Sequence, residues 1–307
     1  MRVTVTGASG LIGGGLIAAL LARGEEVTVL SRDPDRVSSR LPAGVQAQRW
    51  EPLSEPAPTV ALQGRHAVVH LAGEPVAQRW SERTRQAIRD SRILGTRNLV
   101  AGLSALAPDA RPRVLVSSSA IGYYGTTHGA EPIDEEAPPG DDFLAQVCAA
   151  WEAEARAAEA ADLGVRTVQV RTGVVLDRAG GALAKMLPAF RLGIGGPVAG
   201  GRQYVAWIHR DDVLGMMLAA LADERFTGPI NASAPEPVTN REFSHALGRA
   251  LHRPAFMPVP GAALRVLYGD MAEIVTTGVR AVPARALVLG YEFAHPRLDE
   301  ALRAALG

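Results

Sequence analysis

Three glycines near the start of the chain have the spacing of a phosphate-binding loop. Gly7, Gly10 and Gly13 give the pattern G-x-x-G-x-x-G directly after the β-branched run Val3–Val5. In such a loop the first glycine permits a tight turn and the second lets backbone N–H groups approach a pyrophosphate. The third lets the following helix pack closely on the strand, with its positive end toward the phosphates. The motif therefore predicts a bound dinucleotide.

The residues after the second and third predicted strands indicate which dinucleotide is bound. The strand VTVL is followed by Ser31 and Arg32, and an acidic residue comes only at Asp33. NAD sites place an acid here for the ribose 2′-hydroxyl, whereas a guanidinium matches the 2′-phosphate of NADP. We therefore predict NADP, held by Arg32, with NAD held by Asp33 as the open alternative. Trp50 and Glu51 lie at the height of the adenine, although Trp50 is equally well explained as a core residue.

The segments around these residues alternate between strands and helices. RVTVT, the helical stretch LIGGGLIAALLARG closed at Gly24, and EEVTVLSR form a βαβ unit, which requires a parallel sheet. The alternation continues through AVVHLAG, the helical stretch SERTRQAIRDSRILGTRNLVAGL and the strand RVLVSSSA. It ends with the helix AQVCAAWEAEARAAEAAD and the continuous strand VRTVQVRTGVVL. This order predicts an α/β fold with a Rossmann-type doubly wound parallel sheet.

After Leu176 the sequence becomes rich in glycine and loses its clean alternation, which predicts a smaller C-terminal substrate lobe. We expect the Rossmann core to comprise residues 1–175 and 204–232, and the lobe residues 176–203 and 233–307. The lobe should cover the carboxyl edge of the sheet, where ligands bind in open α/β folds. Within these segments, one helix is expected to begin at Asp211 or Asp212 and another at Thr239 or Asn240.

Composition narrows the range of partners. The 307 residues include 32 basic and 32 acidic side chains, so net charge favours neither nucleic acid nor an anionic membrane as partner. Cys148 is the single cysteine, which excludes an internal disulfide and a thiolate metal site, and we predict no metal. The N-terminus lacks an apolar signal core and the apolar runs are too short to span a bilayer, so we expect a cytoplasmic protein.

The motifs, taken together, resemble a known family. TGASGLIG, HLAG, SSSAIGYYG, VRTGVVL and WIHRDDV resemble, in this order, an extended short-chain dehydrogenase/reductase. LAGEPVAQRW, IRDSRILGTRNLV, FLAQVCAAWE, NASAPEPVTNREF and LGYEFAHPRLDEAL are similar to the atypical epimerase family that includes a human epimerase family protein and bacterial nucleoside-diphosphate-sugar epimerases. The resemblance covers essentially the whole chain. It implies NADP(H) binding, a small-molecule substrate and a homodimer formed through the long helices.

The resemblance also implies cofactor contacts position by position. The pyrophosphate would be held by Gly7, Ser9, Gly10, Leu11, Ile12 and Gly13. Arg32 would hold the 2′-phosphate, and Trp50 and Glu51 would line the adenine. The ribose side would be lined by Leu71, Ala72 and Gly73, with Glu74 nearby.

The stretch DFLAQVCAAWE, Asp142–Glu152, lacks the catalytic pair of the extended family. Standard members use a tyrosine to move a proton and a lysine four residues later, on the same helical face, to lower the tyrosine pKa. With Glu152 as the acid that usually follows, Leu144 and Cys148 occupy these two positions. A shift by one residue gives Phe143 and Val147 instead.

No other segment supplies the pair. Lys185 is the only lysine, and none of the five tyrosines precedes it by four residues. The asparagine that usually stands three residues before Gly95 is Arg92. Of the usual catalytic group the serine remains, as Ser119 or alternatively Ser118.

Tyr123, just past the serine strand, is the predicted relocated acid/base, with a packing role as the alternative; Tyr124 is the neighbouring candidate. The other polar candidates have simpler structural explanations: Cys148, Lys185, Arg202, Gln203 and His209. This set of residues leaves two functions open. One is an NADP(H)-dependent oxidoreductase or epimerase with non-standard proton transfer, with Ser119 and Tyr123 as catalytic residues. The other is a non-catalytic NADP(H)-binding sensor or regulator.

Overall fold

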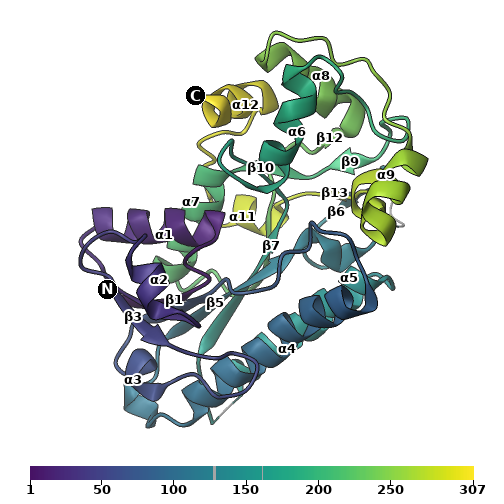
Figure 1. The fold of residues 1–307 in the computed structure, drawn as a ribbon. Helices are drawn as coiled ribbons and strands as arrows, with labels where there is room; N and C mark the ends of the chain where they lie inside the picture. Colours follow the sequence, from purple (N-terminus) through teal and green to yellow (C-terminus); the bar gives the residue numbers. More distant parts are fainter. Residues whose placement is uncertain (127–128, 161) are drawn as a thin grey trace.

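A seven-stranded parallel sheet forms the centre of the fold (Figure 1). This computed structural model describes residues 1–126, 129–160 and 162–307. The strands lie in the order β11-β7-β5-β4-β1-β2-β3, and every pair in this order is parallel. The strands, in chain order, are β1 (Arg2–Thr6), β2 (Glu26–Ser31), β3 (Gln46–Arg49), β4 (Ala67–His70), β5 (Val114–Ala120), β7 (Arg166–Thr172) and β11 (Gly228–Ala232). The predicted doubly wound sheet is confirmed, and its order reverses between β1 and β4, where dinucleotides bind in this architecture.

Helices cover both faces of the sheet (Figure 1). One face carries α1 (Leu11–Ala22) and α7 (Arg210–Ala222), and the other carries α3 (Thr59–Leu62), α4 (Glu82–Ser104) and α5 (Phe143–Arg156). The short helix α2 (Pro34–Ser38) follows β2. Among the described residues, no helix is both long enough and apolar enough to cross a membrane.

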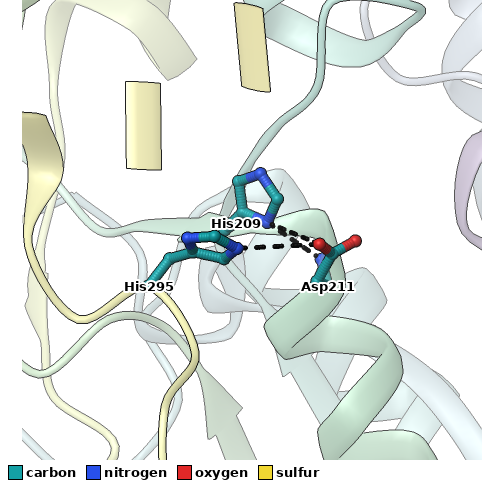
Figure 2. A group of neighbouring side chains, drawn as sticks. All are labelled: His209, Asp211 and His295. Atoms are coloured by element: carbon teal, nitrogen blue, oxygen red, sulfur yellow. Dashed lines mark hydrogen bonds and ion pairs between the residues drawn. The ribbon is translucent and has the colours of Figure 1, made fainter. Parts of the chain in front are cut away.

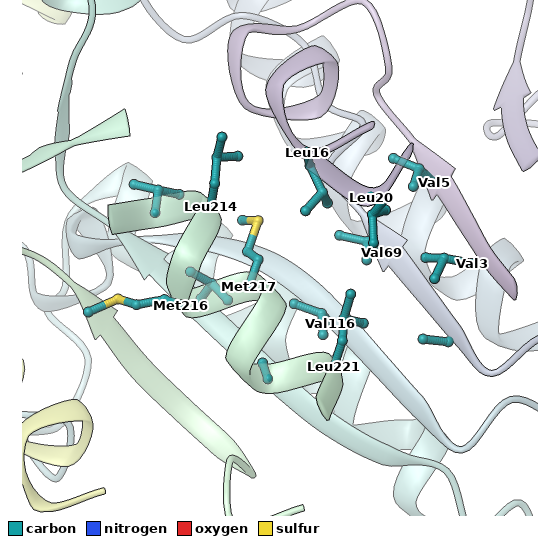
Figure 3. Close-up of a cluster of buried hydrophobic side chains, with 14 of the residues drawn as sticks. Val3, Val5, Leu16, Leu20, Val69, Val116, Leu214, Met216, Met217 and Leu221 are labelled. Atoms are coloured by element: carbon teal, nitrogen blue, oxygen red, sulfur yellow. The ribbon is translucent and has the colours of Figure 1, made fainter. Parts of the chain in front are cut away.

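The larger core cluster lies between the sheet and the α1–α7 layer (Figure 3). It exists because alternate residues of the buried strands point to the same face, where they meet the apolar sides of both helices. The residues labelled in Figure 3 include Val5, Val69 and Val116 from the strands, Leu16 and Leu20 from α1, and Met217 and Leu221 from α7. A second cluster on the opposite face contains Val68, Leu99, Leu103, Leu115 and Ala155.

The C-terminal half adds a group of helices with a core of its own. Helices α6 (Gly181–Arg191), α8 (Asn240–Ala250) and α12 (Leu298–Leu306) pack around Trp207 and Phe243. Three two-stranded sheets connect this region: β8 (Val174–Leu176) with β10 (Trp207–His209), β9 (Tyr204–Val205) with β12 (Val238–Thr239), and β6 (Pro132–Ile133) with β13 (Arg280–Ala281). The remaining helices are α9 (Gly261–Tyr268), α10 (Ala272–Thr276) and α11 (Ala284–Val288), with 3-10 turns η1 (Pro108–Ala110), η2 (Ile121–Tyr124), η3 (Ala157–Glu159) and η4 (Gly269–Met271).

The separate cluster supports the expected division into core and lobe, but the boundary at residues 232/233 stays a prediction. Ala286 of α11, which that boundary assigns to the lobe, packs in the cluster of the sheet.

Two local expectations were wrong. The strand expected to run on to Leu176 breaks at Gly173, where a Cβ atom would lie 2.3 Å from the Ala206 carbonyl oxygen. Helix α7 begins after His209, whose ring accepts a hydrogen bond from the backbone N–H of Asp211, so the cap is neither of the two aspartates. The cap of α8 is Thr239, as expected, in a reciprocal capping box with Glu242.

Candidate functional site

The glycine loop between β1 and α1 leaves no room for side chains at two of its three glycines. Gly7 has a left-handed φ of 72°, and a Cβ atom there would lie 2.7 Å from the Leu71 carbonyl. A Cβ atom at Gly13 would lie 2.3 Å from the Gly7 carbonyl oxygen. The exposed or half-buried residues of the loop are Gly7, Ser9, Gly10, Leu11 and Ile12. The first-turn N–H groups of α1 lack partners within the helix and can bind a phosphate.

The Thr6 hydroxyl joins the end of β1 to the loop after β4. Its oxygen accepts hydrogen bonds from the backbone N–H groups of Leu71 and Ala72, both at 3.1 Å, and lies 2.8 Å from Nδ1 of His70. Burial lowers the pKa of His70 to about 4, so its ring is neutral near pH 7. Since Thr6 already accepts two hydrogen bonds, it donates its own proton to Nδ1, and the ring proton lies on Nε2. These bonds hold two predicted cofactor contacts beside the glycine loop.

Asp33, the acid of the NAD alternative, is a helix cap. Its Oδ1 accepts a hydrogen bond from the backbone N–H of Arg36 at 3.0 Å, at the start of α2. Arg32 is exposed just beyond β2, and within the described part of the chain it makes no hydrogen bond or ion pair. The geometry therefore leaves the guanidinium available for a phosphate and occupies one oxygen of the competing carboxylate.

Trp50 lies in the core at the end of β3. Its side chain is only 2% exposed, and its indole N–H donates to the Glu55 carbonyl at 3.0 Å. The ring centroid lies 6.2 Å from that of His70, and Glu51 beside it is half-buried. This burial favours the core interpretation of Trp50, whereas contacts of Trp50 and Glu51 with an adenine stay predictions.

Arg92 of α4 brings a positive charge close to the position expected for the catalytic lysine. Its Nη1 donates to the Glu74 carbonyl at 3.0 Å, and a Cβ atom at Gly73 would lie 3.3 Å from its Cζ. Burial lowers the pKa of Arg92, while its interaction with Cys148 opposes that shift. The Arg92 Cζ lies 5.1 Å from the ring centroid of Trp151, which stands three residues after Cys148 on α5. The loop 73–74, predicted to line the ribose, is thus fixed by a cation from the neighbouring helix.

Helix α5 presents Leu144 and Cys148 at the two positions of the missing catalytic pair. Cys148 is buried, and burial raises the pKa of its thiol to about 12. A Cβ atom at Gly122 would lie 3.6 Å from the Leu144 Cβ, so this leucine packs on η2. Neither side chain can transfer a proton near neutral pH. The helix begins at Asp142, whose Oδ1 accepts a hydrogen bond from the backbone N–H of Ala145 at 2.9 Å.

Ser119 and Tyr123, the two predicted catalytic residues, contact one buried polar network. The Ser119 hydroxyl donates to Oε1 of Glu152 at 2.7 Å, and the same carboxylate binds Arg171. Arg171 donates through Nη1 to the Tyr124 hydroxyl at 2.9 Å, and its Cζ lies 3.5 Å from the centroid of the Tyr123 ring. The structure therefore brings the two residues together around Arg171, while their role in catalysis stays a prediction.

A largely apolar cavity of about 110 Å³ lies beside Leu144. Its walls come from α5, η2, the segment around α10 and the segment before α4, and include Trp80, Ile121, Gly122, Phe143, Leu144, Ile274 and Val279. Asp142 and Glu273 are the titratable side chains that line it among the described residues. Neither Ser119 nor Tyr123 belongs to its lining. The cavity therefore adjoins the position of the missing tyrosine, but the titratable residues that line it are Asp142 and Glu273 and not the predicted catalytic residues.

Comparison with known proteins agrees with this arrangement. The model of the NAD dependent epimerase/dehydratase family matches residues 3–232. The chain belongs to this family. A model described as a domain of unknown function (DUF1731) matches residues 259–305, which contain α9 to α11 and all but the last residue of α12.

Several relatives of this family match over nearly the whole chain. The chloroplastic homolog of epimerase family protein SDR39U1 from Arabidopsis thaliana is 40% identical over 313 residues, covering 100% of this chain and 87% of the relative. Human epimerase family protein SDR39U1 is 38% identical over 308 residues, covering 99% of both. The crystal structure of the human protein (isoform2) with NADPH superposes with a TM-score of 0.87 at 36% identity over 100% of both chains. The nucleoside-diphosphate sugar epimerase from Corynebacterium glutamicum gives a TM-score of 0.77 at 33% identity, covering 100% of this chain and 58% of that one.

The other polar candidates occupy structural positions in this member of the epimerase family. Lys185 is exposed on α6 and donates to the Ala77 carbonyl at 2.5 Å. The Gln203 amide donates to two backbone carbonyls, at 3.0 and 3.1 Å, and Arg202 beside it is exposed. His209 caps α7. The hydrogen bonds of Lys185 and Gln203 account for these two residues without a ligand.

Sequence reasoning missed Arg171 and Asp142. Arg171 stands in the buried middle of strand β7, and an arginine in a buried strand is a signal that a buried carboxylate is near. Asp142 carried no signal beyond its position before a helix, because its place on the cavity wall depends on residues more than 100 positions away.

Proposed function

We propose that the protein binds NADP(H) along the carboxyl edge of its sheet and acts as an epimerase or oxidoreductase on a small carbonyl or sugar-nucleotide-like substrate. The family assignment supports this function, and so does the superposition with a human relative whose structure contains NADPH. The observation that carries the proposal is the close packing of the glycine loop. Gly7 lies so close to the Leu71 backbone, and Gly13 so close to the Gly7 carbonyl, that neither position has room for a side chain. A loop so built has little use without a phosphate ligand.

The chain offers a contact for each part of the cofactor. The residues proposed to hold NADP(H) are Gly7, Ser9, Gly10, Leu11, Ile12, Gly13, Arg32, Trp50, Glu51, Leu71, Ala72, Gly73 and Glu74. Arg32 would pair with the 2′-phosphate, and Arg92 would hold the loop 73–74 in place beneath the ribose. When bound, NADP(H) supplies or accepts a hydride.

The cavity beside Leu144 is the proposed substrate site. It lies against α5, the helix that carries the acid/base pair in standard members, and its wall is largely apolar. Asp142, the N-cap residue of α5, lines this cavity together with Glu273. We propose that Asp142 exchanges the substrate proton that a tyrosine moves in other members. Ser119 and Tyr123 would then hold η2, which lines the cavity, in place through their contacts with Glu152 and Arg171.

A second function, an NADP(H)-binding sensor without turnover, is favoured by one specific observation. The thiol of Cys148 is buried with a pKa raised to about 12, and Leu144 has no titratable group. A binding module has no need for an acid/base at these two positions. The two functions share the cofactor site, and only the first adds a chemical step once the nucleotide is bound.

One experiment separates the two functions. NADPH and NADH are titrated by fluorescence, and loss of nicotinamide absorbance is then followed with a panel of carbonyls and sugar nucleotides. We expect NADPH to bind at least about tenfold more tightly than NADH, because a guanidinium–phosphate pair is strong, and at least one panel member to be turned over. The matched variants are Asp142→Asn, which keeps a helix cap, Ser119→Ala and Tyr123→Phe. Turnover lost in D142N but retained in Y123F supports the Asp142 assignment, and the reverse result overturns it. Tight NADPH binding with no turnover across the panel establishes the sensor.

Three broader expectations belong to the same proposal. They are the division into a core (1–175 and 204–232) and a lobe (176–203 and 233–307), a homodimer formed through α4 and α5, and a cytoplasmic location. Light scattering of the purified chain tests the homodimer, since a monomeric mass would contradict it. Fractionation of the source cells tests the location.

A further inference from the structure

Two histidines and an aspartate from distant parts of the chain meet at the start of α7 (Figure 2). His209 Nδ1 and His295 Nε2 each lie 3.6 Å from Oδ2 of Asp211. The two imidazole rings are tilted by 49° relative to each other, with centroids 3.9 Å apart. Potential ligand atoms of all three side chains lie within 4.8 Å of one another. None of the three lines the cavity beside Leu144, and none is a proposed cofactor contact.

The backbone holds these side chains in place. His209 ends β10, which pairs with β8, and Asp211 stands in the first turn of α7. The neighbouring Asp212 fixes the C-terminal segment: its Oδ1 accepts from the N–H of Ala294 at 2.6 Å and its Oδ2 from the N–H of His295 at 3.1 Å. The backbone of His295 is therefore held beside the cluster by hydrogen bonds to Asp212, and its imidazole ring takes no part in them.

The two carboxylate oxygens of Asp211 have different neighbours: Oδ1 lies near Arg210, and Oδ2 lies near the two histidines. Arg210 pairs mainly with Asp177, at 2.5 Å, and approaches Asp211 only through Oδ1, at 3.6 Å. Oδ2 of Asp211 is the oxygen near both rings.

From this geometry we propose that His209, Asp211 and His295 form a binding site for a divalent first-row transition metal, with Zn²⁺ as the expected occupant. Two imidazole nitrogens and one carboxylate oxygen are ligands that Zn²⁺ accepts. Ligand bonds of about 2.0–2.1 Å at a tetrahedral angle place two ligand atoms about 3.4 Å apart. The observed separations of 3.6 Å from Asp211 need only a small inward shift, and the two ring nitrogens, which lie within 4.8 Å of each other, would approach by up to about 1.4 Å. The side chain of Asp211 is 51% exposed, so the fourth position opens to water.

Metal binding replaces one weak contact. His209 Nδ1 accepts a hydrogen bond from the N–H of Asp211 at 3.2 Å, and the metal would take this lone pair. The released N–H lies in the first turn of a helix, where such groups are commonly bonded to water. The ion would join the C-terminal segment to the start of α7, so the site is independent of the reaction proposed above.

The test uses the tag-free, EDTA-treated full chain. Isothermal titration with ZnCl₂ should give one site with a dissociation constant of about 10 μM or tighter, since a three-ligand site with an open position binds metal usefully. Asp211→Asn and His295→Gln should each weaken binding at least tenfold. The matched control is His245→Gln, an exposed histidine on α8 that should bind as the parent does. MgCl₂ should not bind, because imidazole ligands suit zinc rather than magnesium.

Two further measurements complete the test. Co²⁺ in place of Zn²⁺ should give visible d–d absorption that D211N and H295Q lose. Zn²⁺ should raise the Tm of the parent by a few degrees but not that of D211N, because a ligand that binds only the folded state stabilises it. The absence of a stoichiometric site, or equal Zn²⁺ affinity in the parent and both ligand variants, would overturn the proposal and leave a histidine–aspartate cluster only.

Discussion

Arg171 and Glu152 form a buried two-pronged ion pair between β7 and α5. Nε of the guanidinium lies 2.8 Å from Oε1 and Nη2 lies 2.9 Å from Oε2, with the side chains only 2% and 0% exposed. Glu152 is the acid that follows the missing lysine, and its carboxylate also accepts a hydrogen bond from the Ser119 hydroxyl. Helix α5 thus keeps Glu152 and its contact with Ser119, while the cation that pairs with Glu152 is Arg171 of β7. The pair positions α5 against the sheet instead of serving a tyrosine.

Removing the charge of Glu152 should destabilise the fold strongly. In Glu152→Gln the buried guanidinium of Arg171 would keep its charge without compensation, and breaking a buried pair in this way costs about 3–5 kcal/mol. Urea unfolding followed by circular dichroism measures the loss. The matched control is Glu154→Gln, which removes an ion pair with the exposed Arg97 and should cost much less. Equal losses in the two variants would show that the buried pair has no special weight.

Cofactor selectivity should depend on Arg32. In Arg32→Ala, NADPH affinity should fall at least about tenfold, since hydrogen bonds to a charged group contribute about 1.5–3 kcal/mol, while NADH affinity should change little. Fluorescence titration of both nucleotides gives the two ratios. Arg36→Ala is the control, because Arg36 is also exposed but lies within α2. If R32A and R36A bind NADPH equally, the assignment of the 2′-phosphate is wrong.

The glycine loop should tolerate an added methyl group at one position and not at its neighbour. A Cβ atom at Gly13 would lie 2.3 Å from the Gly7 carbonyl oxygen, whereas a Cβ atom at Gly14 would lie 3.6 Å from the Ala8 carbonyl oxygen. Gly13→Ala should therefore abolish NADPH binding and lower Tm. Gly14→Ala should bind as the parent does, and alanine in place of a helical glycine adds stability. Nucleotide titration and thermal melting of the pair check this, and normal binding by G13A would refute it.

Stability should fall as the pH drops from about 6.5 to 4, because of His70. Its pKa is lowered from 6.5 to about 4 in the folded state, so over this range the unfolded chain binds a proton that the folded chain does not. Protonation then favours unfolding, and the loss attributable to His70 approaches about 3 kcal/mol at the acid end. Urea unfolding of the parent and of His70→Asn between pH 4 and 7.5 measures it. The variant should show a flatter profile, His245→Asn should match the parent, and identical profiles for H70N and the parent would contradict the expectation.

The fold was predictable because its signals are local. The glycine spacing, the β-branched runs and the helical periodicity each lie within a short window, and together they predicted the parallel sheet around β1. The strand break at Gly173 was missed because its cause, the Ala206 carbonyl, belongs to a segment that is distant in sequence. The cap of α7 was misassigned because an imidazole that accepts a backbone N–H is rarer than a carboxylate in that role.

The site was only partly predictable for the same reason. The cofactor loop is continuous in sequence, so its residues could be named. Arg171, Asp142 and His295 act through partners on other elements, which no window of sequence brings together. Arg92 was recognised as a substitution for the usual asparagine, but its proximity to Cys148 emerges only when α4 packs on α5.

Because Arg92 lies near Cys148, we predict that its positive charge replaces the charge of the lysine that standard members carry at position 148. Cys148→Lys alone would bury a second cation beside Arg92 and should destabilise the protein by several kcal/mol. Arg92→Asn alone should cost less, because it removes the bond to the Glu74 carbonyl but leaves no buried charge. If the two positions share one cation, the double variant R92N/C148K has the asparagine and lysine of standard members and should be more stable than the sum of the two losses predicts. Urea unfolding of the four proteins gives the coupling free energy, expected to be favourable by at least about 1 kcal/mol. If the losses in the free energy of unfolding are additive, Arg92 and residue 148 do not interact. In that case Arg92 of α4 does not replace the lysine charge that is missing from α5.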